Sequence, residues 1–332
     1  MLPPSITKTI GTLLDQAERI LVITHLVPDG DALGSLTATG QALQQLNKSF
    51  SLVVDDGLPS RFSYLPLAQH VLVAPDADAN YDLIIAVDAG DLERLGQAYT
   101  NLNQAIPHII NIDHHITNTQ YGQVNLVLPE ANATVEILYH LFPELNVTIT
   151  PDIAVSLLTG LLTDTLGLRT AGVGADTLKI ASALVEAGAD LFTIFTKALT
   201  RKPLSTLLIW QKGLNNMKLD GDVIWTTISK AERHETGQNS TGSSGLGNMM
   251  ADIDQVAMSA VLTETDDGYV TVSFRCRPPY SVSSLAEDFG GGGHHLAAGC
   301  TLPGSLDEIE SLIVARSIDS INEQRASQAK VD

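Results

Sequence analysis

The sequence predicts an α/β protein with two domains, a larger N-terminal domain built on a parallel sheet and a smaller C-terminal α/β domain. The chain has 332 residues, more than a single compact core usually serves, so about two domains are expected. Its first third contains short apolar runs without polar alternation, as in parallel strands that are buried on both faces. Stretches with helical periodicity separate these runs, and such alternation of strands and helices is typical of α/β folds.

The predicted N-terminal domain contains three buried strands, at residues 20–24, 83–87 and 109–112. Each strand is rich in Ile, Val or Leu, and an Asp or a His follows it directly. Helices are expected at 31–46 and 131–141, because Leu and Val recur there every three or four positions.

A helical region and a second group of strands complete the chain. The pattern is helical throughout 151–216, with helices expected at 153–162, 175–187 and 204–214. Short β-rich runs and a last helix follow, at 223–228, 256–263, 269–275 and 305–324. We therefore expect an N-terminal domain at 1–195, a helical connection at 196–216 and a C-terminal domain at 217–327.

The charge of the chain excludes some classes of partner. The formal net charge is −19, and such a field repels long polyanions, so long duplex DNA and membrane surfaces are not expected partners. Only Cys276 and Cys300 are present, which excludes a disulfide framework and a four-thiolate zinc site. No apolar run approaches the roughly 20 residues of a membrane span. We expect a cytoplasmic protein, and a small anionic ligand held by a few cations stays open.

Acidic and histidine side chains follow all three predicted N-terminal strands. They are His25, Asp29 and Asp31 after the first strand, Asp88 after the second, and Asp113, His114 and His115 after the third. Taken singly, the acids also fit ordinary turns in which they cap the backbone. Taken together they indicate a site, because the carboxyl ends of parallel strands meet at one edge, where open α/β sheets bind ligands.

The composition of this cluster indicates metal ions. Carboxylates and imidazoles without thiolates suit Mn²⁺, Mg²⁺ or Co²⁺, and the imidazoles favour Mn²⁺ over Mg²⁺. Two ions are expected rather than one, because about four carboxylates in one pocket would otherwise repel one another. Asp164 is a further candidate ligand at the end of the predicted helix 153–162, where a carboxylate opposes the helix dipole. Its alternative role is to cap the segment that follows.

A glycine-rich segment stands far along the chain, at residues 289–299. Four consecutive glycines precede His294 and His295, and their backbone N–H groups would be able to converge on one phosphate. The alternative is a flexible linker, although linkers usually repeat Gly and Ser over a longer stretch. Arg275 ends the preceding predicted strand and is either a phosphate ligand or an ordinary surface residue.

These motifs together resemble the DHH phosphoesterase family with its DHH-associated C-terminal domain, and most closely the nanoRNase and phosphoadenosine phosphate phosphatase type. The matching pieces occur in the family's order: His25-x-x-Pro28-Asp29-Gly30-Asp31, Val87-Asp88, Asp113-His114-His115, Thr163-Asp164-Thr165, Arg275 and the glycine segment 290–299. The sequence departs from the family at 166–170, which lacks the family's aromatic residues, and at Cys276 and Ser281. The resemblance implies an active-site cleft between the two domains.

The resemblance also implies roles for individual residues. One Mn²⁺ would be held by His25, Asp29 and Asp88, and the second by Asp31, Asp88, His114 and Asp164. His115 would act at the scissile phosphate, with Asp88 bridging the ions and Asp113 orienting the histidines. The C-terminal domain would grip the substrate through Arg275, Gly292, Gly293 and His294.

The implied activity is a Mn²⁺-dependent phosphoesterase. It would cleave short oligoribonucleotides (nanoRNA) to mononucleotides, and phosphoadenosine phosphate to AMP and phosphate. The resemblance is also compatible with a homodimer. Two alternatives stay open. One is a phosphodiesterase for cyclic dinucleotides or linear dinucleotides, and the other is a nucleotide-binding regulator without catalysis.

Overall fold

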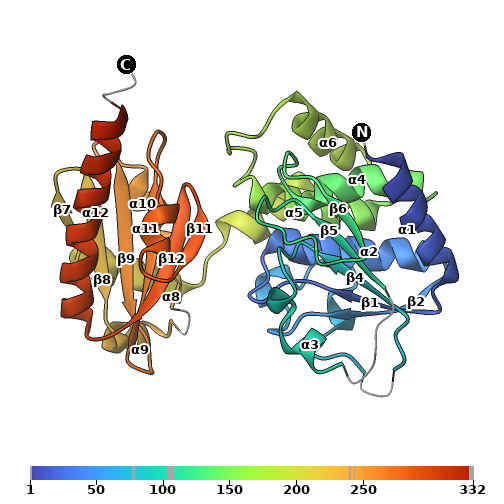
Figure 1. Cartoon of the computed structure of the whole chain (residues 1–332), viewed down its shortest axis with the longest axis horizontal. Helices are drawn as coiled ribbons and strands as arrows, with labels where there is room; N and C mark the ends of the chain where they lie inside the picture. Colours follow the sequence, from blue (N-terminus) through green and yellow to red (C-terminus); the bar gives the residue numbers. More distant parts are fainter. Residues whose placement is uncertain (1, 77–78, 103–107, 239–240, 243, 329–332) are drawn as a thin grey trace. The chain divides into compact units, whose positions relative to one another are not determined.

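The computed structural model describes residues 2–76, 79–102, 108–238, 241–242 and 244–328. The chain divides into two compact units, Met1–Arg201 and Lys202–Asp332, each with its own sheet (Figure 1). The predicted connection at 196–216 spans the end of the first unit and the first helix of the second. The predicted domain limits also include residues 1, 77–78, 103–107, 239–240 and 243, which lie outside the described residues.

The N-terminal unit is built on a six-stranded sheet in which all neighbouring strands are parallel. Its strands are β1 (Arg19–Ile23), β2 (Ser49–Val53), β3 (Val71–Leu72), β4 (Leu83–Val87), β5 (Ile109–Asp113) and β6 (Val124–Val127), in the order β3-β2-β1-β4-β5-β6. The register places Val22 opposite Leu52 on one side and Ile85 on the other. The predicted parallel α/β domain is confirmed, with β1, β4 and β5 at the predicted strands.

Both faces of this sheet are covered, which explains the continuous apolar runs. Ile20 and Val22 belong to a core with α1 (Pro4–Gln16), α2 (Gly30–Gln45), α4 (Thr134–Glu144) and α5 (Pro151–Asp164). Leu21 and Ile23 belong to a second core with η3 (Glu93–Leu95) and α3 (Gly96–Thr100) (Figure 1). A strand buried on both sides gains by being apolar at every position.

Smaller helices complete the N-terminal unit. They are η1 (Ser60–Phe62), η2 (Ala68–His70), α6 (Ala175–Glu186), α7 (Leu191–Phe195) and η4 (Thr196–Thr200). The helical pattern predicted from 151 onward therefore corresponds to α5, α6, α7 and η4, followed by α8 of the next unit. In the part of the chain that the structure describes, no helix is long and apolar enough to span a membrane.

The C-terminal unit contains a second six-stranded sheet, of mixed direction. Its strands are β7 (Lys218–Asp220), β8 (Val223–Ile228), β9 (Met258–Glu264), β10 (Tyr269–Cys276), β11 (Gly292–His294) and β12 (Ala297–Pro303), in the order β11-β12-β10-β9-β8-β7. The pair β8 and β9 is parallel and the other neighbours are antiparallel. The predicted α/β character of this smaller domain is confirmed.

Helices also cover this second sheet. α11 (Ser283–Glu287) and α12 (Leu306–Gln328) pack with Val272 and Phe274 of β10. α8 (Leu204–Asn215) and α10 (Leu246–Ala251) pack with Ile224 and Val261 on the opposite face. α9 (Lys230–Thr236) begins with a capping box, because Ser229 and Glu232 each accept a hydrogen bond from the other's backbone N–H.

Glycines bring α2 and α5 into close contact in the N-terminal unit. A Cβ atom on Gly34 would lie 2.5 Å from the Ser156 carbonyl oxygen, and one on Gly160 would lie 2.6 Å from Val135 and 2.7 Å from Asp31. No residue with a side chain fits at either position unless the neighbouring atoms move. Because α2 carries Asp31 in its first turn and α5 ends at Asp164, this contact determines how closely the two acids approach.

Candidate active site

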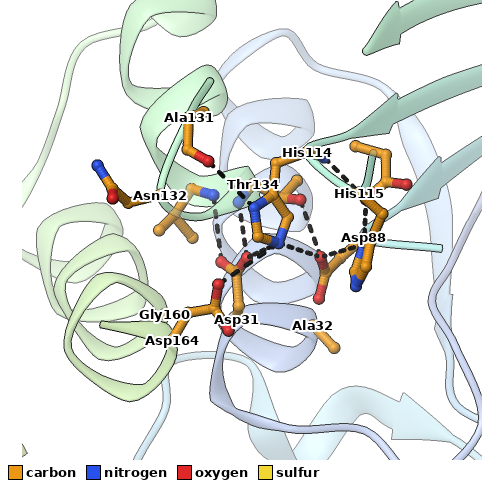
Figure 2. Close-up of polar contacts among 12 residues, drawn as sticks. Asp31, Ala32, Asp88, His114, His115, Ala131, Asn132, Thr134, Gly160 and Asp164 are labelled. Carbon is orange, nitrogen blue, oxygen red and sulfur yellow. Dashed lines mark hydrogen bonds and ion pairs between the residues drawn. The ribbon is translucent and has the colours of Figure 1, made fainter. Parts of the chain in front are cut away.

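The acidic and histidine residues predicted from the N-terminal sequence come together at the carboxyl ends of β1, β4 and β5. Three groups of side chains have ligand atoms within 4.8 Å of one another. The groups are His25 with Asp29 and Asp88; Asp31 with His114 and Asp164; and Asp88 with His114 and His115. Figure 2 shows how Asp31, Asp88, His114 and Asp164 point toward one another.

The first group is built on the turn between β1 and α2. His25 is buried, and its Nδ1 donates to the Leu26 carbonyl at 2.6 Å, which directs Nε2 to within 3.6 Å of an Asp88 carboxylate oxygen. Asp29 caps α2, and its Oδ1 accepts hydrogen bonds from the backbone N–H groups of Asp31 and Ala32. The capping role considered for Asp29 is therefore real, and it coexists with a position beside His25 and Asp88.

The second group, Asp31, His114 and Asp164, lies where α2 and α4 begin and where α5 ends. Asp31 is 1% exposed and accepts hydrogen bonds from the Thr134 and Val135 N–H groups at the start of α4, at 2.6 and 3.2 Å. His114 donates through Nδ1 to the Ala131 carbonyl at 3.2 Å, and its Nε2 lies 3.4 Å from Asp164 and 3.9 Å from Asp31. The helix dipole of α4 favours the Asp31 carboxylate.

Asp164 is the last residue of α5 and does not cap the next helix, α6, whose N-cap is Gly174. Its position beside His114 and near other carboxylates is therefore not explained by the alternative capping role. Burial, together with the carboxylates of Asp29 and Asp88, raises the pKa of Asp164 to about 7, although His114 opposes this shift.

Asp88 lies at the centre of the cluster. Its Oδ1 accepts a hydrogen bond from the Thr134 hydroxyl at 2.9 Å and lies 3.7 Å from His114 Nε2, while Oδ2 faces His25. Its backbone has a φ of 57°, an uncommon conformation for Asp that turns the chain sharply after β4. Burial opposes ionisation, but the surrounding histidines hold the pKa of Asp88 below its usual range. Asp88 is thus an ionised carboxylate shared by two groups.

A hydrogen bond from its Nδ1 to Asp113 orients the ring of His115. The fully buried Asp113 carboxylate accepts hydrogen bonds from His115 Nδ1 at 2.7 Å and from the His114 backbone N–H at 2.8 Å. Burial lowers the pKa of His115, but this hydrogen bond and the charge of Asp88 outweigh burial and raise it to about 9. The neighbouring carboxylates therefore favour the protonated ring.

The donor set fits divalent ions. The imidazole nitrogens of His25 and His114 lie 3.4–3.9 Å from the carboxylate oxygens that they face, longer than the roughly 2.7–3.2 Å usual for a hydrogen bond. Nitrogen and oxygen ligands of one ion have such separations, since each lies about 2.0–2.2 Å from the ion. Four neighbouring carboxylates need cations to offset their repulsion, as the raised pKa of Asp31, caused by burial and by Asp88 and Asp164, also indicates.

The remaining predicted residues lie in the C-terminal unit. Arg275 of β10 and His294 of β11 both pair with Ala297 of β12, so the three residues form one row across the sheet. Gly292 and Gly293, which were predicted to help cradle a phosphate, lie in the edge strand β11, where they are exposed. The segment pairs with β12 because glycine lets two backbones approach: a Cβ on Gly293 would lie 2.5 Å from Ala298.

Three polar residues around these groups were not predicted. Thr134 contacts Asp31 and Asp88, Asn118 contacts Asp113, and Asn248 accepts a hydrogen bond from Arg275 Nε at 2.7 Å. Thr134 lies inside the helix predicted at 131–141 and is the first residue of α4, so its place in an apolar helical pattern is a signal for a helix but not for contacts with Asp31 and Asp88. Asn118 and Asn248 carry no such signal, because their roles depend on contacts between separate segments.

Comparisons with known proteins agree with this arrangement. Residues 19–161 match the DHH family, N-terminal domain, and residues 223–321 match the DHHA1 domain. The bifunctional oligoribonuclease and PAP phosphatase NrnA of Thermus thermophilus is 31% identical over 294 residues, which cover 87% of this chain and 86% of the relative. The cyclic-di-AMP phosphodiesterase GdpP of Geobacillus thermodenitrificans is 25% identical over 87% of this chain, but over only 45% of that relative. An exopolyphosphatase-related protein from Bacteroides fragilis has the same fold, with a TM-score of 0.88 at 23% identity over 96% of this chain and 97% of that one.

Proposed function

The chain belongs to the DHH phosphoesterase family, whose members are metal-dependent hydrolases, and we propose that it cleaves short oligoribonucleotides to mononucleotides and phosphoadenosine phosphate to AMP and phosphate. Relatives named for both activities support this choice, and one of them matches over most of both chains. The observation that carries the proposal is that two ligand groups meet: Asp88 of one and His114 of the other also belong to a third group, with His115, and His114 Nε2 lies 3.7 Å from Asp88 Oδ1.

We propose that the two groups hold two divalent ions, with Mn²⁺ favoured by the imidazole ligands. His25, Asp29 and Asp88 would hold one, and Asp31, Asp88, His114 and Asp164 the other. When bound, such ions activate water and offset the charge of a phosphate. Thr134 stabilises one ligand of each group, because its N–H donates a hydrogen bond to Asp31 and its hydroxyl donates one to Asp88.

We propose that His115 donates a proton or hydrogen bond to a phosphate oxygen or to the leaving group. Asp113 engages Nδ1, so the ring would meet the substrate with Nε2. A raised pKa favours the protonated ring, which donates rather than accepts. Asp113 would act through His115 by fixing the orientation of its ring.

In the C-terminal unit, we propose that Arg275 binds a substrate phosphate, with Gly292, Gly293 and His294 beside it. The guanidinium donates to Asn248 and to the Phe274 carbonyl, and no carboxylate forms an ion pair with it among the described residues. Burial lowers the pKa of Arg275, but an arginine stays charged in proteins. A half-buried cation without an acidic partner suits an anionic ligand.

The test is a Mn²⁺-dependent hydrolysis panel with the Asp88→Asn variant. Asn keeps the shape of Asp88 but removes the charge shared by the two groups, so turnover should fall by about a thousandfold or more, the several kcal/mol that metal ions contribute. Asp176→Asn is the matched control, because that exposed acid pairs with Lys179 on the surface of α6. Near wild-type turnover of a folded Asp88→Asn protein would refute the proposed two-ion site.

The same panel separates the alternatives. It would include dinucleotides, longer RNA, phosphoadenosine phosphate, cyclic di-AMP and pyrophosphate. Preference for cyclic di-AMP would favour the activity for which GdpP is named, although this chain spans less than half of that relative. Thermal stabilisation by phosphoadenosine phosphate without any hydrolysis would favour a nucleotide-binding regulator. A homodimer and a cytoplasmic location stay predictions from the sequence.

A further inference from the structure

Asn118 connects the two segments that carry Asp113 and Asp88. Its Nδ2 donates to Asp113 Oδ2 at 2.6 Å and to the carbonyl of Ala89, the residue after Asp88, at 3.2 Å. The neighbouring Thr119 N–H donates to the Gly90 carbonyl at 2.9 Å. One side-chain amide therefore joins the loop after β5 to the turn after β4.

The surrounding hydrogen bonds fix the orientation of this amide. Its Oδ1 accepts from Asn111 Nδ2 at 2.9 Å and from the Gln120 backbone N–H at 2.7 Å. A flipped amide would place its oxygen against the Asp113 carboxylate and its NH₂ group against these donors. Only one orientation is consistent with the network.

Resting on the proposed function, we propose that Asn118 is a positioning residue, which holds Asp113 so that His115 is aimed at the substrate and also holds the turn that presents Asp88. Asp113 is fully buried, and its two oxygens have different partners. Oδ1 accepts hydrogen bonds from His115 Nδ1 and from the His114 backbone N–H, and Oδ2 accepts one from Asn118 Nδ2. Without Asn118, the Oδ2 side would lose this charge-assisted hydrogen bond, and the carboxylate would rotate.

Two substitutions test this role. Asn118→Ala removes the donor, and Asn118→Asp places a second carboxylate against Asp113. With a substrate that the wild type hydrolyses, kcat should fall about 10–100-fold, as for other residues that orient an active group, while KM stays within about threefold. Asn118→Asp should be the more impaired.

Asn125→Ala is the matched control. Asn125 accepts a hydrogen bond from Asn111 in the same network, and its other hydrogen bonds are to Gly122. It has no hydrogen bond to Asp113 or Ala89 among the described residues. This variant should lose stability but keep kcat within about threefold of wild type.

A second readout does not depend on turnover. In the metal-free protein, the NMR signal of the His115 Nδ1–H group should shift or broaden in both Asn118 variants and stay in place in Asn125→Ala. Affinity for Mn²⁺, measured by calorimetry, should fall in the Asn118 variants, because the turn that presents Asp88 loses its hydrogen bond from Asn118.

The outcomes separate the two proposals. If folded Asn118→Ala has the kcat of Asn125→Ala, or loses kcat with the Nδ1–H signal and Mn²⁺ affinity unchanged, the positioning role is wrong. If the wild type hydrolyses nothing in the panel, the proposed function is wrong. The NMR and calorimetry results then decide alone whether Asn118 holds Asp113 and the Asp88 turn.

Discussion

Replacing Gly34 by Ala should push α2 and α5 apart and weaken metal binding at a distance from the ligands. The new Cβ would lie 2.5 Å from the Ser156 carbonyl oxygen, whereas ordinary contacts begin at 3.4 Å. The backbone at this contact must therefore shift by roughly 0.5–0.9 Å, because the opposing atom belongs to the backbone and cannot rotate away.

The cost follows from two opposing effects. Overpacking a core costs about 1–3 kcal/mol, and Ala in place of Gly in a helix returns up to about 1 kcal/mol. The free energy of unfolding should fall by about 1–2 kcal/mol, which lowers Tm by about 2–8 °C in a unit of this size. Mn²⁺ affinity should fall about tenfold, because Asp31 and Asp164 move with their helices.

The assay combines thermal unfolding with and without Mn²⁺ and titration calorimetry. Gly11→Ala in α1 is the control, since its Cβ would meet only Leu145 at an ordinary 3.6 Å and should leave Tm unchanged or raise it. Unchanged Tm and Mn²⁺ affinity in Gly34→Ala would refute the claim that backbone contact between the helices determines the ligand spacing.

Three further predictions concern metal ions, substrate and support of the cluster. In the chelated protein, stability should decrease as pH rises from about 4 to 7, because folded Asp164, whose pKa is raised to about 7, holds a proton that the unfolded chain has released. Chelation should therefore lower Tm more at pH 8 than at pH 5, and an equal effect at both would contradict the assignment. Asn248→Ala should raise KM about tenfold with little change in kcat, since Arg275 loses the hydrogen bond that orients it, and steady-state kinetics will detect this. Thr134→Val should lower Mn²⁺ affinity in calorimetry about tenfold, because the Asp88 oxygen loses the Thr134 hydroxyl; unchanged affinity would argue against that support.

Patterns within single segments predicted much of the fold. The strands β1, β4 and β5 were recognisable because each contains a run of buried Ile, Leu or Val residues, and the candidate ligands were recognisable because they stand at or just after the ends of these runs. β2 was missed, since its sequence Ser-Phe-Ser-Leu-Val is partly exposed and lacks a continuous apolar run. β11 was not predicted as a strand, because its glycines have no strand propensity and pair with β12 by close approach of the two backbones.

Contacts between segments were beyond prediction for a physical reason. The hydrogen bonds of Asn118 and Asn248 link residues that are adjacent only after folding, and Asn is common in turns for unrelated reasons. Likewise, glycine in a helix usually indicates lower stability, so the sequence does not reveal that Gly34 and Gly160 permit contact between two helices.

The close contact of α2 and α5 also bears on the size of ion that the site would accept. Flexible side chains adapt to ions of different radius, but Asp31 and Asp164 are carried by helices whose backbones already touch. Mg²⁺ binds oxygen at about 2.0–2.1 Å and Ca²⁺ at about 2.3–2.6 Å, so Ca²⁺ requires a wider set of ligands. Tightening the cluster is opposed by repulsion between backbone atoms, and widening it removes packing between the helices. The glycines would thus make this centre selective for one narrow range of ionic radius.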